Sequence, residues 1–139
     1  MPSAPKLRIL IADDDRDTVV TLGAILRDEG HEVHTALRGD EVLDMDRLTR
    51  PDVVVLDISM PGMSGYAVAR EIRERRAPLA PLLIAISGKW TQKSDELLAH
   101  EVGFDHYLLK PCDAARMLSL LSAYEQRQQG LAALQSSRK

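Results

Sequence analysis

PDVVVLDISMPG, which runs from Pro51 to Gly62, predicts a buried strand followed by a loop. Val53–Leu56 is an unbroken apolar run rich in β-branched residues, a pattern typical of a strand that is buried on both faces. Asp57 ends this run, and the pair Pro61-Gly62 predicts a loop shortly after it. We therefore expect Asp57 at the carboxyl end of a buried strand, where open α/β sheets place their ligand sites. A carboxylate there is either a helix cap or a reacting group.

Four further apolar runs predict strands, and helical spacing of apolar residues fills the intervals between them. The other strands are expected at 7–12, 33–36, 82–86 and 106–109, and the helices at 18–29, 40–48, 66–76, 94–102 and from 113 onward. Alternating strands and helices predict an α/β fold with a mainly parallel sheet and right-handed crossovers. Residues 6–125 are assigned to one domain. Residues 126–139 are assigned to a polar extension of the last helix or a disordered tail.

Composition narrows the class of protein. A length of 139 residues fits one domain with one substantial core. The net charge of −3 argues against nucleic acid as the main partner, because there is no basic excess to neutralise phosphates. A single cysteine, Cys112, cannot form an internal disulfide and fits a reducing compartment. Neither a signal segment nor a run long enough to span a bilayer is apparent, so we expect a cytoplasmic protein with no membrane association.

Polar residues stand where four of the five predicted strands end. They are Asp13 and Asp14, Asp57, Ser87, and Lys110. The carboxyl ends of parallel strands lie along one edge of a sheet, so these side chains can converge. Three carboxylates close together repel one another and favour a bound cation, and Mg²⁺ is a hard ion that prefers oxygen ligands. A carboxylate nucleophile, a cation, a hydroxyl and a lysine are the groups that phosphoryl transfer requires.

Four motifs together resemble the receiver domain of bacterial two-component response regulators. They are IADD at 11–14, DISMPGMSG at 57–65, Ile86-Ser87 and Lys110-Pro111, in the order and approximate spacing of that family. The resemblance covers residues 6–121. It implies a flavodoxin-like, doubly wound, five-stranded parallel sheet of strand order 2-1-3-4-5 in a single domain. It also implies a phosphorylation-dependent signalling switch that takes its phosphoryl group from a histidine kinase or a histidine phosphotransfer protein.

The same resemblance implies a role for each acidic residue. Asp57 resembles the phosphoacceptor of the family. Asp14 resembles the direct Mg²⁺ ligand, together with Asp57 and the backbone carbonyl of Ser59. Asp13 matches the acid that orients a metal-bound water molecule. The cofactor that the resemblance implies is therefore Mg²⁺.

The remaining matched residues concern the response to phosphorylation. Ser87 matches the switch hydroxyl that turns toward the phosphoryl group, and Lys110 matches the lysine that pairs with that group. Tyr107 matches the aromatic residue whose rotamer follows activation. The resemblance implies signalling to an unidentified partner protein through the face formed by the helix at 94–102, the strand at 106–109 and the last helix, or onward transfer of the phosphoryl group.

Several positions refine or depart from the family pattern. Gly88 stands where alanine is usual, which predicts a more open phosphoryl site. Ser59 and Lys89 occupy positions that tune the lifetime of the aspartyl phosphate in the family, and the Lys110–Pro111 bond is cis there. Residues 103–111 are most similar to receivers attached to hybrid histidine kinases. The chain is thus expected to be a free-standing or an excised receiver, and the start at Met1 favours the former.

The acidic residues also admit other interpretations. Asp13, Asp14 and Asp15 precede a predicted helix, and Asp15 or Asp17 is expected to cap it. An aspartate-nucleophile phosphatase resembling haloacid dehalogenases would need an acid two residues after Asp57, where Ser59 stands. A docking module that is never phosphorylated would not need the full set of acids, serine and lysine. We therefore expect no enzyme beyond Mg²⁺-dependent self-phosphorylation and self-dephosphorylation.

Residues 70–76, at the end of a predicted helix, are rich in arginine. Cations at this end offset the helix dipole. We expect a solvated face there rather than a phosphate or nucleic-acid site.

Overall fold

The computed structural model describes residues 6–88 and 93–136, and these form a five-stranded parallel sheet in the order β2-β1-β3-β4-β5. The strands are β1 (Arg8–Ala12), β2 (Glu32–Ala36), β3 (Val53–Asp57), β4 (Leu82–Ser87) and β5 (His106–Leu109). The helices are α1 (Arg16–Asp28), α2 (Gly39–Thr49), α3 (Gly65–Arg76), α4 (Lys93–Val102) and α5 (Ala114–Ser136). The predicted fold class and strand order are confirmed.

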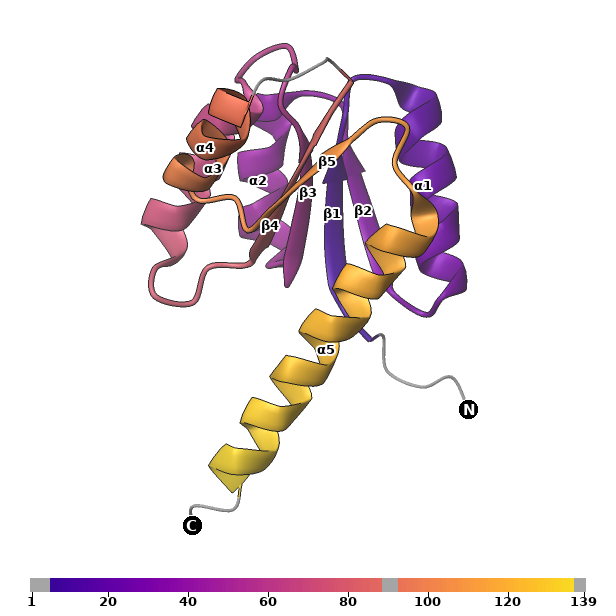
Figure 1. Cartoon of the computed structure of the whole chain (residues 1–139), viewed down its shortest axis with the longest axis vertical. Helices are drawn as coiled ribbons and strands as arrows, with labels where there is room; N and C mark the ends of the chain where they lie inside the picture. Colours follow the sequence, from indigo (N-terminus) through magenta and orange to yellow (C-terminus); the bar gives the residue numbers. More distant parts are fainter. Residues whose placement is uncertain (1–5, 89–92, 137–139) are drawn as a thin grey trace.

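Helices cover both faces of the sheet (Figure 1). One apolar cluster joins the sheet to α1 and α5, and the other joins it to α2, α3 and α4. Successive strand residues point to opposite faces, so Val53 and Val55 enter the first cluster while Val54 and Leu56 enter the second. This double burial explains why the central strand has no polar residue before Asp57.

The register of the strands brings the predicted site residues to one edge. Leu56 of β3 lies opposite Ala12 of β1, so Asp57 and Asp13 are the next residues on adjacent strands. On the other side, Ser87 of β4 pairs with Leu109 of β5, directly before Lys110. Neighbouring strands therefore end nearly level. Residues distant in the sequence meet where the strands stop.

The last helix continues well past the sheet. Met117 and Leu121 near its start are fully buried against the core. Its second half projects away from the body of the domain (Figure 1), and Leu131 and Leu134 there are exposed. Within residues 6–88 and 93–136, none of the helices combines the length and apolar character that a bilayer-spanning segment requires.

Two of the arginines in α3 are structural, which corrects the expectation of a solvated face. Arg76 forms an ion pair with the buried Asp46 of α2 at 2.9 Å and donates to the carbonyl of Pro51 at 2.8 Å. Arg73 donates to the carbonyl of Gly103 and pairs with Asp105 at 2.7 Å. Residues three apart on a helix share a side. This pair of arginines consequently faces neighbouring elements rather than solvent.

Candidate functional site

A lysine ammonium lies between two buried carboxylates at the edge of the sheet. The Nζ atom of Lys110 is 2.5 Å from Oδ2 of Asp13 and 3.2 Å from Oδ2 of Asp57. Asp13 is completely buried, and Asp57 is 5% exposed. Charges removed from water in this way must be paired. Lys110 supplies that pairing, so the predicted meeting of these three residues is confirmed.

Asp57 is held by the loop that follows it as well as by the lysine. The backbone N–H of Ser59 donates to Oδ1 of Asp57 at 3.2 Å, and Lys110 donates to Oδ2. The base of the loop is closed by a hydrogen bond from the Gly65 N–H to the carbonyl of Ile58 at 2.8 Å. Both carboxylate oxygens of Asp57 are therefore held in a fixed orientation.

The surroundings of Asp57 change its acidity. Burial raises the pKa of Asp57 to about 6, and the negative charge of Asp13 adds to the effect. The Ser59 N–H and the ammonium of Lys110 oppose this rise. Burial would lower the pKa of Lys110, but Asp13 and Asp57 outweigh it and raise that pKa. Asp57 is thus mostly ionised at neutral pH, and a further cation would stabilise its charge.

The acidic residues are arranged so that they could hold a metal ion. Asp13, Asp14 and Asp57 each offer a carboxylate oxygen, and the three oxygens lie within 4.8 Å of one another. Asp14 is on the exposed side of the group. Oδ2 of Asp13 is buried, and the ammonium of Lys110 is the cation that pairs with it among the described residues. An all-oxygen donor set of three close carboxylates fits a hard divalent cation. Ser59 as a carbonyl ligand stays a prediction.

The two predicted switch residues come from the adjacent strands β4 and β5. Ser87 is buried at the end of β4, and its carbonyl accepts a hydrogen bond from the Lys110 N–H at 2.7 Å. Tyr107 packs against the apolar cluster on the α4 side of the sheet. Its hydroxyl is buried and has no hydrogen-bond partner among residues 6–88 and 93–136. An unsatisfied buried hydroxyl favours a second rotamer that reaches a partner. The switching roles themselves stay predictions.

Gly88 leaves space beside Lys110. A Cβ atom at position 88 would meet only the side chain of Lys110, at an ordinary contact distance of 3.5 Å. The usual alanine would therefore fit, and glycine leaves this side of the site more open. The Lys110–Pro111 peptide bond is cis, as the resemblance implied. Lys89, which the resemblance assigns to a position that tunes the phosphate lifetime, lies outside the described residues.

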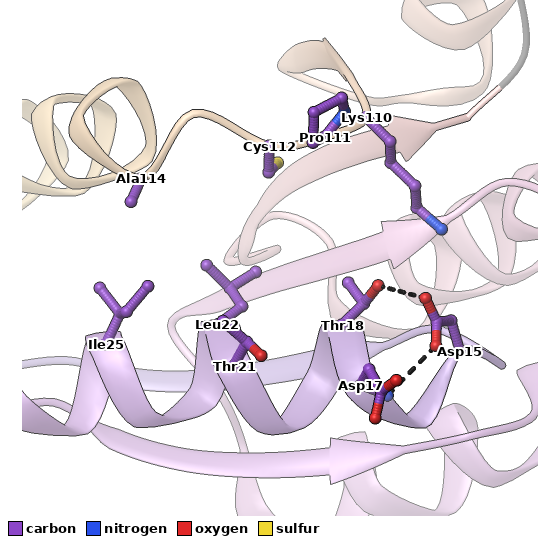
Figure 2. Close-up of a pocket in the computed structure, with 10 residues that line it drawn as sticks. All are labelled: Asp15, Asp17, Thr18, Thr21, Leu22, Ile25, Lys110, Pro111, Cys112 and Ala114. Carbon is purple, nitrogen blue, oxygen red and sulfur yellow. Dashed lines mark hydrogen bonds between the residues drawn. The ribbon is translucent and has the colours of Figure 1, made fainter.

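A groove that the sequence did not predict lies beside the carboxylates. Figure 2 shows it between α1 and the segment that joins β5 to α5, with the Lys110 side chain reaching toward the Asp15 end of α1. The groove has a volume of about 500 Å³. Its lining residues are Asp15, Asp17, Thr18, Thr21, Leu22, Ile25, Lys110, Pro111, Cys112 and Ala114. Thr18, Leu22 and Ile25 recur at helical spacing, but that pattern alone does not reveal a gap opposite it.

Two residues at the groove have separate local roles. Asp15 caps α1, accepting hydrogen bonds from the Asp17 N–H at 3.1 Å and the Thr18 hydroxyl at 2.8 Å, as the sequence predicted (Figure 2). Cys112 is half-buried, and burial raises the pKa of its thiol. The thiol is therefore protonated and unreactive at neutral pH, which fits a packing role.

Comparisons with known proteins agree with this geometry. The sequence model of the response regulator receiver domain matches residues 9–122. Protein PilH from Pseudomonas aeruginosa is 34% identical over 116 residues, which cover 84% of this chain and 95% of PilH. The transcriptional regulatory protein PrrA from Mycobacterium leprae is 35% identical over 130 residues, which cover 94% of this chain and 54% of PrrA. The chain thus spans about half the length of PrrA.

Solved structures with the same fold are also receivers. A CheY-like response regulator receiver domain from Methanospirillum hungatei has a TM-score of 0.81 and 25% identity, covering 92% of this chain and 98% of that one. The signal receiver domain of a histidine kinase from Syntrophus aciditrophicus has a TM-score of 0.76 and 27% identity, covering 86% and 90%. The chain therefore belongs to the response regulator receiver domain family and is a module of two-component signalling.

Proposed function

We propose that Asp57 accepts a phosphoryl group from the phosphohistidine of a histidine kinase or a histidine phosphotransfer protein. One observation carries this proposal: Asp57 ends a fully buried strand with Oδ2 on Lys110, Oδ1 on the Ser59 N–H, and Asp13 and Asp14 alongside. A rigid, ionised carboxylate with cationic partners is a suitable nucleophile toward phosphorus. The phosphorylated and unphosphorylated chains are then the two states of the switch.

The transfer requires one bond to form and one to break. An ionised oxygen of Asp57 attacks phosphorus and forms the aspartyl phosphate, while the bond from phosphorus to the donor imidazole nitrogen breaks. That nitrogen keeps the electron pair. Lys110 already lies at hydrogen-bond distance from Asp57, so its ammonium can pair with a phosphoryl oxygen without a large movement. Later attack of water on phosphorus returns Asp57 and inorganic phosphate.

We propose Mg²⁺ as the cation. Asp14, Asp57 and the carbonyl of Ser59 would hold it directly, and Asp13 would hold it through a water molecule. When bound, Mg²⁺ supplies positive charge that stabilises the transferring phosphoryl oxygens. The close group of carboxylate oxygens supports this assignment.

The groove beside the site supports a place for the phosphodonor. Leu22, Ile25 and Ala114 give it an apolar lining, and Asp15 and Lys110 lie at the end nearest the carboxylates. An amphipathic helix packs into a groove of this kind through its apolar face. A histidine on such a helix would face Asp57. We place this exchange in the cytoplasm, where the single cysteine would stay reduced.

We propose that the output partner protein binds the face formed by α4, β5 and α5. Leu97 and Leu109 are 60% and 55% exposed there, and Tyr107 joins this face to the edge that carries Ser87. Exposed leucines provide contact area for a partner protein. We propose no turnover of other substrates, because Ser59 stands where a phosphatase of the haloacid dehalogenase type needs its general acid.

Mass spectrometry after incubation with Mg²⁺ and acetyl phosphate tests the proposal. We expect one added phosphoryl group on the wild-type protein and none on Asp57→Asn. Asp44→Asn serves as a matched control, since Asp44 is an exposed acid in an ion pair with Arg47, and it should be labelled like the wild type. Equal labelling of Asp57→Asn, or no labelling of the wild type, would contradict the proposal.

A further inference from the structure

The start of α2 touches the loop that follows Asp57. The backbone N–H of Gly39 donates to the carbonyl of Pro61 at 3.0 Å. A Cβ atom at position 39 would lie 2.0 Å from the carbonyl oxygen of Met63, far inside any allowed contact. Only glycine permits this approach of two backbones. The contact also pairs one N–H of the first turn of α2, where Arg38 provides no side-chain cap.

The tip of the loop is enclosed from a second direction. Gly62 has a φ of 87°, a conformation that glycine adopts at little cost. A Cβ there would lie 2.4 Å from Oδ1 of Asp40, and the same oxygen pairs with Nε of Arg38 at 3.0 Å. Arg38 and the first residues of α2 therefore lie against the tip formed by residues 61–63.

The base of the same loop is anchored to the sheet. The Ile58 N–H donates to the carbonyl of Ile86 at 3.1 Å, and the Gly65 N–H donates to the carbonyl of Ile58 at 2.8 Å. Ser59 lies between this base and the tip, and its N–H donates to Asp57. The position of the Ser59 peptide group is thus fixed by the hydrogen bonds at the base of the loop and by the contacts at its tip.

We propose that Gly39 is a positioning residue for the metal site, because its backbone contact with Pro61 and Met63 sets the place of the Ser59 carbonyl. This inference rests on the proposed function, in which that carbonyl is a Mg²⁺ ligand. Mg²⁺ demands near-ideal octahedral geometry at short distances, so a small displacement of one ligand weakens binding. Gly39 itself touches neither the metal nor the phosphoryl group.

A purely structural role for Gly39 makes a different prediction. In that case Gly39→Ala would lower stability but leave the affinity of the folded protein for Mg²⁺ unchanged. With a positioning role, coupling is reciprocal: displacement of the loop weakens Mg²⁺ binding, and bound Mg²⁺ tightens the Gly39–Pro61 contact. Metal affinity and amide exchange at Gly39 therefore distinguish the two roles.

The first test compares Gly39→Ala with Gly23→Ala by calorimetric titration with Mg²⁺. A Cβ at Gly23, inside α1, would meet only side-chain atoms at 3.5 Å or more, so this control repeats the same chemical change without a clash. We expect the dissociation constant for Mg²⁺ to rise about tenfold or more in Gly39→Ala, because Mg²⁺ tolerates little displacement of a ligand from octahedral geometry. Gly23→Ala should stay close to the wild type. An unchanged dissociation constant in folded Gly39→Ala would overturn the inference.

The second test needs no variant and decides the matter if Gly39→Ala does not fold. Saturating Mg²⁺ should slow hydrogen exchange of the Gly39 amide in the wild-type protein. The Gly30 amide, which donates to the carbonyl of Arg27 in the turn after α1, is the internal control and should not change. Equal behaviour of both amides would overturn the inference. If the wild type bound Mg²⁺ and were phosphorylated in that case, the proposed function would still hold; a wild type that bound no Mg²⁺ would overturn both.

Discussion

At the scale of single residues, the charge of the Asp57 carboxylate is subject to opposing interactions. Burial and Asp13 disfavour its charge, whereas Lys110 and the Ser59 N–H favour it. The disfavouring effects are larger, because the pKa rises from 3.8 to about 6. The folded protein therefore keeps a charge at neutral pH that the fold only partly compensates. Binding of a cation at Asp57 would therefore stabilise the folded state.

This imbalance predicts how Asp57 affects stability. Its folded pKa is above its unfolded value, so the folded state binds the proton more tightly between about pH 4 and pH 6, and stability is lost as the pH rises through that window. Asp57→Asn imitates the protonated form. In urea unfolding at pH 7.5 without Mg²⁺ we expect this variant to be more stable than the wild type by about 2 kcal/mol. The gain should vanish near pH 4; a less stable variant at pH 7.5 would show that the ion pair with Lys110 dominates.

The same pKa predicts a pH dependence of metal binding. Protons and Mg²⁺ compete for Asp57, and protonation becomes extensive below its pKa of about 6. The apparent affinity for Mg²⁺ should be nearly constant above pH 7 and should fall by about tenfold for each pH unit well below 6. Calorimetric titrations at pH 5, 6, 7 and 8 would measure this. Equal affinity at pH 5 and pH 8 would exclude Asp57 as a ligand.

At the scale of elements, a buried ion pair joins α3 to α2. Asp46 in α2 is buried, and Arg76 reaches it from α3 while also donating to the carbonyl of Pro51. Loss of one member of a buried pair leaves the other charge uncompensated. The pair thus fixes α2 relative to α3, and α2 is also the helix whose first turn contacts the loop after Asp57.

Replacement of Arg76 should accordingly be costly. We expect Arg76→Ala to lower the free energy of unfolding by about 3 kcal/mol. Arg75→Ala is the matched control, because Arg75 pairs with Glu71 on the exposed side of the same helix and should cost less than about 1 kcal/mol. Urea denaturation of both variants measures the difference. Similar small losses of stability in the two variants would mean that water compensates the charge of Asp46 when Arg76 is removed.

The groove between α1 and the β5–α5 segment gives an element-scale prediction about the donor. Ile25 lines the groove, whereas Val20 on the same helix is 61% exposed and does not line it. Ile25→Lys should slow phosphotransfer from a phosphorylated histidine phosphotransfer protein by about tenfold or more, as expected for a charge placed in an apolar contact. Labelling by acetyl phosphate should be unaffected, and Val20→Lys should behave like the wild type with both donors. Equal slowing by the two variants would place the donor elsewhere.

At the scale of the whole molecule, the parallel sheet is what gathers the site. Asp13, Asp57, Ser87 and Lys110 come from four strands, and all of them meet at the carboxyl edge. The opposite end of the domain carries the projecting half of α5 (Figure 1). We therefore expect a change in charge at Asp57 to act on strands β4 and β5 rather than on that far end.

The sequence was sufficient for those features that depend on local pattern and chain order. The apolar residues on both faces predict buried strands at Val53–Leu56 and Leu82–Ile86. The polar residues that follow these strands indicate the carboxyl edge of the sheet. Features that need two segments in contact could not be predicted. Arg76 meets Asp46 across 30 residues of sequence, and Gly39 meets Met63 although α2 and β3 lie between them in the chain. Neither residue differs in local pattern from an ordinary surface arginine or turn glycine.

We expect a phosphoryl group on Asp57 to switch the face formed by α4, β5 and α5. Mg²⁺ with beryllofluoride, a stable imitation of the phosphoryl group, tests it most directly when amide resonances of the isotope-labelled protein are compared before and after addition. We expect changes at Ser87, Tyr107 and Leu109 as well as around Asp57, and no response in Asp57→Asn. Changes confined to the residues that surround Asp57 would contradict the account.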